Sequence, residues 1–150
     1  MRILIQRVSE ARVTVEGTVT GEIGPGLLIF VGIEEGDDKE DIEWLAGKVS
    51  RLRIFNDEDD KMNHSVTDVD GGILCVSQFT LFASTQKGNR PGFTRSAAPR
   101  VADPIYERFV AYLGAVSGRT VETGTFGADM KVSLVNDGPV TIWMDSKARE

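Results

Sequence analysis

Two short stretches are unusually rich in hydrogen-bonding side chains for a strand end or a turn. Ser77-Gln78-Phe79-Thr80-Leu81 follows the apolar run 73–76, and Asn136-Asp137-Gly138-Pro139-Val140-Thr141 separates two strand-like segments. A hydroxyl such as that of Ser77 or Thr80 can act as a nucleophile, or it can only position a substrate. Taken alone, the first stretch is also compatible with a strand end and the second with a plain turn.

The usual catalytic and metal-binding side chains are scarce. The single histidine, His64, lies in a polar segment with no obvious catalytic partner, and the single cysteine, Cys75, lies within an apolar run. The common zinc ligand sets are therefore not available, and Cys75 is expected to be a small buried residue. We expect no metal and no cofactor, and an enzyme with this sequence would work without the commonest general base.

The charge is unevenly distributed along the chain. The net charge is -6, which argues weakly against nucleic acid binding. However, residues 71–102 contain no Asp or Glu, and this segment includes Lys87, Arg90, Arg95 and Arg100. Such a segment is either a local docking surface for an anion or simply a solvated loop, and charge alone does not separate the two.

Length and composition are those of an ordinary globular domain. The 150 residues, with 41% hydrophobic and 27% charged side chains, predict one domain spanning 1–150. No apolar run is long enough to span a membrane, and the first residues do not resemble a signal peptide, so we expect a cytoplasmic protein with no membrane partner.

Hydrophobic periodicity and turn residues predict an α+β fold. Strands are expected at 3–8, 11–16, 19–23, 27–33, 73–78, 120–123, 130–135 and 140–144, with 79–82 as a possible continuation of the fifth. Helices are expected at 39–52, capped by Asp37 or Asp38, and from Asp103 as cap and Pro104 as first residue to Gly118. The elements predict a mostly antiparallel curved sheet or open β-barrel with two packed helices.

The two opening stretches, together with their flanks, resemble the D-aminoacyl-tRNA deacylase (D-tyrosyl-tRNA(Tyr) deacylase) family, whose members remove D-amino acids from tRNA. The resemblance covers essentially the whole chain, and both motifs are intact. Further matching segments are 4–8, 13–17, 21–24, 53–55, 61–63, 90–91 and 126–130.

The resemblance implies a homodimer with two sites at the interface. Each site would combine the Ser77, Gln78, Phe79 and Thr80 stretch of one subunit with Gly138 and Pro139 of the other. The implied substrate is a D-aminoacyl ester on the 3′-terminal adenosine of tRNA, which water cleaves. Glycine is achiral, so mischarged glycyl-tRNA(Ala) is expected to be a second substrate.

The resemblance also implies roles for residues outside the two motifs. Phe126 and Met130 match positions that hold the terminal adenine, and Arg7 matches a residue that helps to fix the Gly-Pro loop. The implied absence of a side-chain base agrees with the scarcity of histidine, because positioning and backbone donors can carry such a reaction. Lys87 and Arg90, with Arg95, are then expected to meet phosphates of the acceptor stem.

We expect the Gly138-Pro139 bond to be cis and to read the chirality of the substrate. Glycine lets the backbone approach a ligand closely, and a cis bond is less costly before proline than elsewhere. The two carbonyls would hold the α-amino group of a D-residue and leave no space for an L side chain. Two alternatives are a non-catalytic RNA-binding dimer of the same fold, and a hydrolase that uses Ser77 or Thr80 as a covalent nucleophile.

Overall fold

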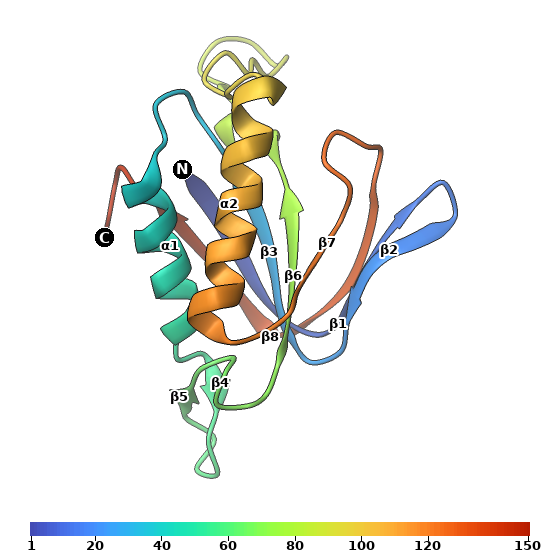
Figure 1. Ribbon diagram of the computed structural model, residues 1–150, viewed down its shortest axis with the longest axis vertical. Coiled ribbons are helices and arrows are strands. Elements are labelled where there is room, and N and C mark those ends of the chain that lie inside the picture. Colours follow the sequence, from blue (N-terminus) through green and yellow to red (C-terminus); the bar gives the residue numbers. More distant parts are fainter.

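The computed structural model describes residues 1–150 and contains a curved, partly closed sheet with two helices packed on one face (Figure 1). The helices are α1 (Lys39–Arg51) and α2 (Pro99–Ser117), and a short 3-10 helix, η1, spans Phe79–Phe82. The strands are β1 (Arg2–Val15), β2 (Thr18–Ile23), β3 (Gly26–Gly32), β4 (Phe55–Asn56), β5 (Met62–His64), β6 (Gly72–Ser77), β7 (Val121–Thr123) and β8 (Lys131–Asp145).

The main sheet has the strand order β2-β1-β3-β6-β7, and β8 pairs with the other edge of β1. The pairs β1–β2, β1–β3 and β1–β8 are antiparallel, whereas β3–β6 and β6–β7 are parallel. The predicted α+β class, with a mostly antiparallel curved sheet and two helices, is therefore confirmed.

The alternation of side chains along the central strands divides the core into two clusters. On β3, Leu27, Ile29 and Val31 face the helices and pack in the larger cluster, which includes Leu45 of α1 and Phe109 of α2. The intervening Leu28 packs in a smaller cluster enclosed by the curl of the sheet. This two-sided burial explains why 27–33 reads as a continuous apolar run.

Helix α1 begins where the sequence predicts. Asp38 is the N-cap: its carboxylate accepts from the backbone N–H of Glu40, and the Asp41 carboxylate accepts in return from the N–H of Asp38. Such a capping box satisfies two otherwise unpaired donors at the start of a helix. The predicted start of α2 is wrong by five residues, because the helix begins at Pro99 with Ala98 as its N-cap, and Pro104 lies inside it. Pro99 fills the first helical position, in which proline needs no N–H.

Two predicted breaks between strands are also wrong, and the possible continuation of the fifth strand does not form. The segments 3–8 and 11–16 form one strand, β1, and the segments 130–135 and 140–144 form one strand, β8. Both halves of β8 pair with β1, so residues 137–140 are an outward loop within a single strand, not a hairpin turn. Residues 79–82 do not extend β6, because Leu81 and Ala83 donate three residues back and form η1.

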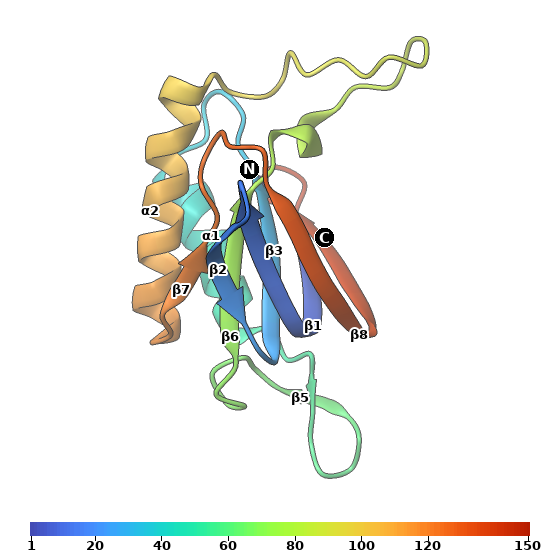
Figure 2. The same ribbon diagram turned by 90° about the vertical axis from the view of Figure 1, so that its right-hand side faces the viewer.

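Two segments project from the body of the molecule (Figure 2). The arm, residues 84–92, extends away from the sheet and is closed at its base by two backbone hydrogen bonds between Ser84 and Gly92. The β4–β5 hairpin, whose turn holds Asp57, Glu58, Asp59 and Asp60, projects at the other end. Neither helix is both long and apolar enough to cross a lipid bilayer.

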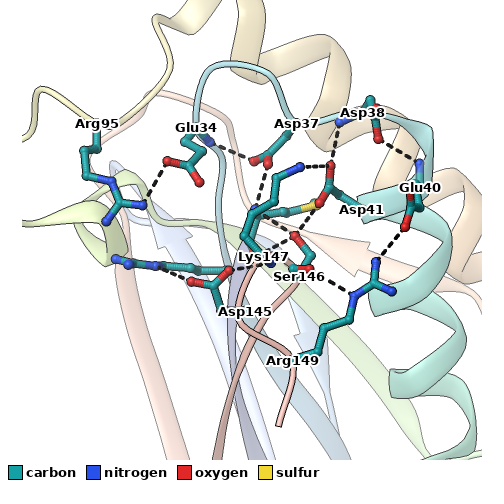
Figure 3. A network of polar contacts seen from close by, with 12 residues as sticks. Glu34, Asp37, Asp38, Glu40, Asp41, Arg95, Asp145, Ser146, Lys147 and Arg149 are labelled. Atoms are coloured by element: carbon teal, nitrogen blue, oxygen red, sulfur yellow. Dashed lines mark hydrogen bonds and ion pairs between the residues drawn. The ribbon is translucent and has the colours of Figure 1, made fainter.

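A polar network joins residues 145–149 to the start of α1 (Figure 3). The Asp41 carboxylate accepts from the Ser146 hydroxyl and from Lys147 Nζ, and the Met1 amino group donates to Asp37 Oδ1 over 2.7 Å. Burial acts to raise the pKa of Asp41, but these hydrogen bonds outweigh burial and hold its pKa below the usual range. At Asp37 burial prevails, and the pKa is raised.

Candidate functional site

A cleft of about 570 Å³ opens between the end of β6, the start of α2 and the loop before β8. Ser77, Gln78 and Phe79 line it on one side, and Phe126 and Met130 line it on the other. The remaining lining residues are Val31, Ile33, Val76, Phe93, Ser96, Ala97, Ala98, Pro99, Ala102, Gly127, Ala128, Asp129 and Val132. Segments more than 40 residues apart, both singled out in the sequence, therefore meet at one mostly apolar cleft with a few polar groups.

The end of β6 places the first motif at the edge of this cleft. The parallel ladder with β3 reaches Ser77, and the backbone N–H of Gln78 then donates to Val31 O over 2.7 Å. After that bond the chain turns into η1, and this turn exposes Phe79 and Thr80. Thr80 is not among the lining residues of the cleft, so the structure places it beside the cleft, one residue beyond Phe79.

The hydroxyl of Thr80 has a hydrogen-bond donor as its neighbour. Gln78 Nε2 donates to Thr80 Oγ1, so the hydroxyl oxygen is an acceptor in this contact and its own proton is free to donate. Activation of a hydroxyl as a nucleophile needs an adjacent base instead. His64, on β5, does not line the cleft, and burial raises the pKa of Cys75 to about 12. The geometry thus favours positioning by Thr80 over nucleophilic attack.

Phe93 is a cleft residue that the sequence analysis missed. Its ring meets that of Phe79 edge to face, with centroids 5.1 Å apart and an interplanar angle of 75°. Phe93 directly follows the arm, whose base closes at Gly92. Its position after the Gly-Arg-rich segment was the available signal, because an isolated aromatic residue in a polar loop usually packs against something.

The other wall of the cleft rests on the buried ring of Tyr106. The Phe126 ring lies 6.0 Å from the ring of Tyr106, and the Tyr106 hydroxyl donates to Cys75 O over 2.8 Å. Burial raises the pKa of Tyr106 well above its usual value, so this phenol stays neutral. A side chain at Gly124 would meet Met130 Sδ and the side chain of Val13, so glycine lets Met130 lie close to the sheet here.

Gly138 and Pro139 lie far from this cleft within the same chain. Strand registers pair Arg7 with Leu27 and Leu27 with Ile73, which places the loop level with the start of β6, whereas Ser77 is at its end. Four residues of strand correspond to roughly 13 Å. In Figure 1 the middle of β8 accordingly lies at the lower end, towards the β4–β5 hairpin, and β6 points upwards.

Arg7 braces the loop against the neighbouring hairpin. Its Nε donates to Asp137 O over 2.8 Å, and its Nη1 donates to Ile54 O over 2.7 Å. The Gly138-Pro139 peptide bond is cis, and both residues are exposed. A side chain at Gly138 would collide with Val140 and crowd Arg7, so the position requires glycine.

The basic residues of segment 85–95 have two different environments. Lys87 and Arg90 are exposed on the arm. Arg95 instead donates from Nη2 to Glu34 Oε2 over 3.1 Å, which anchors the end of the segment to the loop before α1 (Figure 3). Arg95 is therefore the least available of the three for an external anion. No group of three or more His, Cys, Asp or Glu side chains is arranged to hold a metal ion.

Comparison with known proteins identifies relatives along the full length. The family described as D-Tyr-tRNA(Tyr) deacylase matches residues 4–145. A D-aminoacyl-tRNA deacylase of Flavobacterium johnsoniae is 61% identical over 150 residues, which is 100% of both chains. A second D-aminoacyl-tRNA deacylase, of Chromobacterium violaceum, is 60% identical with the same coverage. Among solved structures, the c-Myc DNA unwinding element binding protein superposes with a TM-score of 0.92 and 39% identity, covering 99% of this chain and 100% of that one.

Proposed function

This chain belongs to the D-Tyr-tRNA(Tyr) deacylase family and is a hydrolase acting on carboxylic ester bonds, and we propose that it removes D-amino acids from tRNA in the cytoplasm. The substrate is the ester between a D-amino acid and the 3′-terminal adenosine. The oxygen of a water molecule bonds to the acyl carbon, the acyl–oxygen bond to the ribose breaks, and the ribose oxygen takes up a proton. The products are the free D-amino acid and the tRNA.

The observation that carries this proposal is the cleft between the two walls. On one side Phe126 and Met130 offer an apolar surface on which a base can stack. On the other side, Ser77, Gln78 and Phe79 surround the space where the ester linked to that base would lie. A substrate that has both an aromatic base and a polar acyl linkage fits this distribution.

Catalysis in this proposal rests on positioning and not on a side-chain base. The backbone N–H groups of Phe79 and Thr80 begin η1, ahead of the first hydrogen bond within it, and can donate to the oxyanion that forms on the acyl carbon. The free proton of the Thr80 hydroxyl is a third donor. The ribose hydroxyl next to the ester is assigned as a proton relay: it accepts a proton from the attacking water and passes its own proton to the leaving ribose oxygen, so that no side-chain base is needed.

The site is proposed to be completed by a second copy of the chain. Gly138 and Pro139 are too far from the cleft of their own chain to enter it, yet they project from the sheet on a braced loop. The sheet face opposite the helices also carries a partly exposed apolar row, in which Leu4 lies directly between Phe30 and Trp143; Leu4 and Phe30 are half-buried, and Trp143 is 48% exposed. A partly exposed apolar row of this kind suits a subunit interface, and a two-fold dimer would form two equivalent sites.

Selection of the D-enantiomer is assigned to the Gly-cisPro motif of the second copy. The carbonyls of Gly138 and Pro139 would hold the α-amino group, while their backbone would occupy the space of an L side chain. Rejection by exclusion does not read the side chain, so a wide range of D-amino acids and glycine, including glycyl-tRNA(Ala), should be cleaved. The arm residues Lys87 and Arg90 would contact phosphates of the acceptor stem.

Subunit complementation tests the shared site. Thr80→Ala and Gly138→Ala each impair a different half of the site, so each homodimer should be weakly active. After the two variants are unfolded and refolded together, random pairing should restore about a quarter of wild-type activity, because half of the dimers then have one intact site. An absence of any recovery, with heterodimers demonstrated by mass spectrometry, would contradict a site made of two copies.

A second candidate function is a non-catalytic nucleic-acid-binding protein of the same fold. The similarity to the c-Myc DNA unwinding element binding protein favours it, since that protein is named for binding DNA. Incubation of the purified chain with D-tyrosyl-tRNA separates the two functions. Release of D-tyrosine at catalytic chain concentrations supports the deacylase, whereas binding without release supports the alternative. A covalent acyl-enzyme, detected by mass spectrometry after rapid quenching, would instead indicate a nucleophile at Ser77 or Thr80.

A further inference from the structure

The loop that contains Gly138 and Pro139 lacks the support that the rest of β8 receives. The ladder with β1 pairs Thr141 with Gln6 and Asn136 with Val8, so residues 137–140 all lie opposite Arg7 alone. An insertion of this size leaves its residues outside the ladder of backbone hydrogen bonds. Its conformation must therefore be fixed by side chains.

The side chain of Asn136 closes the base of this loop. Its Oδ1 accepts from the N–H of Val140 over 2.8 Å, and its Nδ2 donates to Val140 O over 3.2 Å. The amide group therefore pairs with both backbone groups of Val140, as a neighbouring strand would. The same Nδ2 donates to Thr141 Oγ1 over 3.0 Å, and Gln6 Nε2 on β1 donates to that hydroxyl oxygen over 3.4 Å.

Asn136 and Arg7 hold opposite ends of the loop. Arg7 fixes the carbonyl of Asp137 at the start, and Asn136 fixes both backbone groups of Val140 at the end. Gly138 and Pro139 are the two residues between these fixed points, and their own groups are exposed. The loop can therefore present its tip to a second molecule without ordering it first, which reduces the entropy cost of binding.

We propose that Asn136 is a positioning residue for the deacylation site. It fixes the direction in which Gly138 and Pro139 project into the cleft of the second copy, and thereby it sets how strictly D- and L-aminoacyl esters are distinguished. This inference rests on the proposed function, and it concerns a residue that touches no substrate. A displacement of about 1 Å at such a site is enough to reduce catalysis by two orders of magnitude.

Only asparagine offers this set of bonds at position 136. Aspartate would keep the acceptor for the Val140 N–H but would lose both donated bonds and would place a charged oxygen against Val140 O. Alanine would lose all three bonds. The hydroxyl of Thr141 can be removed separately with Thr141→Val, which preserves the shape of the side chain and the bonds between Asn136 and Val140.

The test compares kcat and KM for D- and L-tyrosyl-tRNA in the wild type, Asn136→Ala, Asn136→Asp and Thr141→Val. The matched control is Ser133→Ala, an exposed polar residue of the same strand, three positions away and opposite Arg12. Asn136→Ala and Asn136→Asp should lower kcat for the D-substrate at least tenfold. They should also lower the ratio of kcat/KM for D-tyrosyl-tRNA to that for L-tyrosyl-tRNA at least tenfold. The thermal unfolding temperature and the size of the dimer should stay as in the wild type. Thr141→Val should show a smaller change of the same sign, and Ser133→Ala should show none.

A second measurement reports on the hydrogen bonds between Asn136 and Val140 without relying on activity. The amide hydrogen of Val140 should exchange with solvent at least tenfold faster in Asn136→Ala than in the wild type, as observed by NMR. In folded Asn136→Ala, an unchanged exchange rate of the Val140 amide hydrogen would overturn the proposal. An unchanged ratio of kcat/KM for the D- and L-substrates would overturn it too. If Asn136→Ala does not fold, wild-type kinetics in both Asn136→Asp and Thr141→Val would overturn it. A wild type that releases no amino acid would refute the proposed function. The exchange rate of the Val140 amide hydrogen would then still show whether Asn136 holds the loop.

Discussion

The rings of Phe79 and Phe93, which both line the cleft, lie edge to face with their centroids 5.1 Å apart. This contact joins the segment that follows β6 to the residue that follows the exposed arm. Each ring thus limits the movement of the other, and the arm carrying Lys87 and Arg90 is attached directly to the wall of the candidate site.

Phe93→Ala should therefore impair deacylation although Phe93 lies outside both sequence motifs. Edge-to-face pairs contribute about 0.5–1.5 kcal/mol, so kcat/KM should fall roughly twofold to tenfold. Phe93→Tyr preserves the ring and should retain wild-type activity. Steady-state kinetics with D-tyrosyl-tRNA measure both variants, and equal losses in the two would show that the ring contact is not what matters.

Thr80→Ala should slow turnover without abolishing it. Since Gln78 presents a donor to the Thr80 hydroxyl, loss of that hydroxyl removes a positioning group, and kcat should fall about tenfold to a hundredfold, or roughly 1.4–2.7 kcal/mol. Single-turnover kinetics on a variant with wild-type thermal stability provide the measurement. Complete loss of activity in the folded variant would restore the nucleophile hypothesis.

The basic residues of segment 85–95 should differ in their effect on tRNA binding. Removing a side chain that neutralises one phosphate should reduce the slope of log affinity against log salt by about 0.9, so Lys87→Ala and Arg90→Ala should each flatten it. Arg95→Ala should change the slope less, because Arg95 is paired with Glu34. Binding titrations with uncharged tRNA at several salt concentrations test this. If the slopes of all variants equal that of the wild type, Lys87 and Arg90 do not contact tRNA phosphates.

The network at the start of α1 should make stability depend on pH in the acid range. The folded-state pKa of Asp41 is lowered, so its contribution is fully present above the unfolded value of about 3.9 and is lost as the pH falls below it. Asp41→Asn cannot titrate, so its loss of stability relative to the wild type should be larger at pH 6 than at pH 2.5. Urea unfolding at the two pH values measures the difference, and a constant difference would exclude this linkage.

Local signals in the sequence were sufficient for much of the fold. The capping of α1 at Asp38 and the apolar run of β3 depend on neighbouring residues, and both agree with the structure. The continuity of β8 was not predictable in this way, because it depends on both halves pairing with β1, more than 110 residues earlier in the chain. The stretch 136–141 was consequently expected to separate two strands, 130–135 and 140–144.

The site shows the same division between local and long-range information. Ser77 could be identified because its stretch directly follows a buried strand, and Phe126 and Met130 were assigned from the resemblance; all three line one cleft. Phe93 was missed because its partner, Phe79, is 14 residues away in a segment with no periodicity. The distance between the cleft and Gly138 was not visible either, since it follows from the strand registers.

The most direct test of the proposed function is the deacylation of matched D- and L-tyrosyl-tRNA by the wild-type chain. The two substrates differ only at one carbon, so tRNA binding and the ester chemistry are the same for both. We predict that the chain, at concentrations far below that of the substrate, releases D-tyrosine at least a hundredfold faster than L-tyrosine, corresponding to about 2.7 kcal/mol of discrimination. Equal rates for the two enantiomers, or no release of D-tyrosine above the uncatalysed rate, would contradict it.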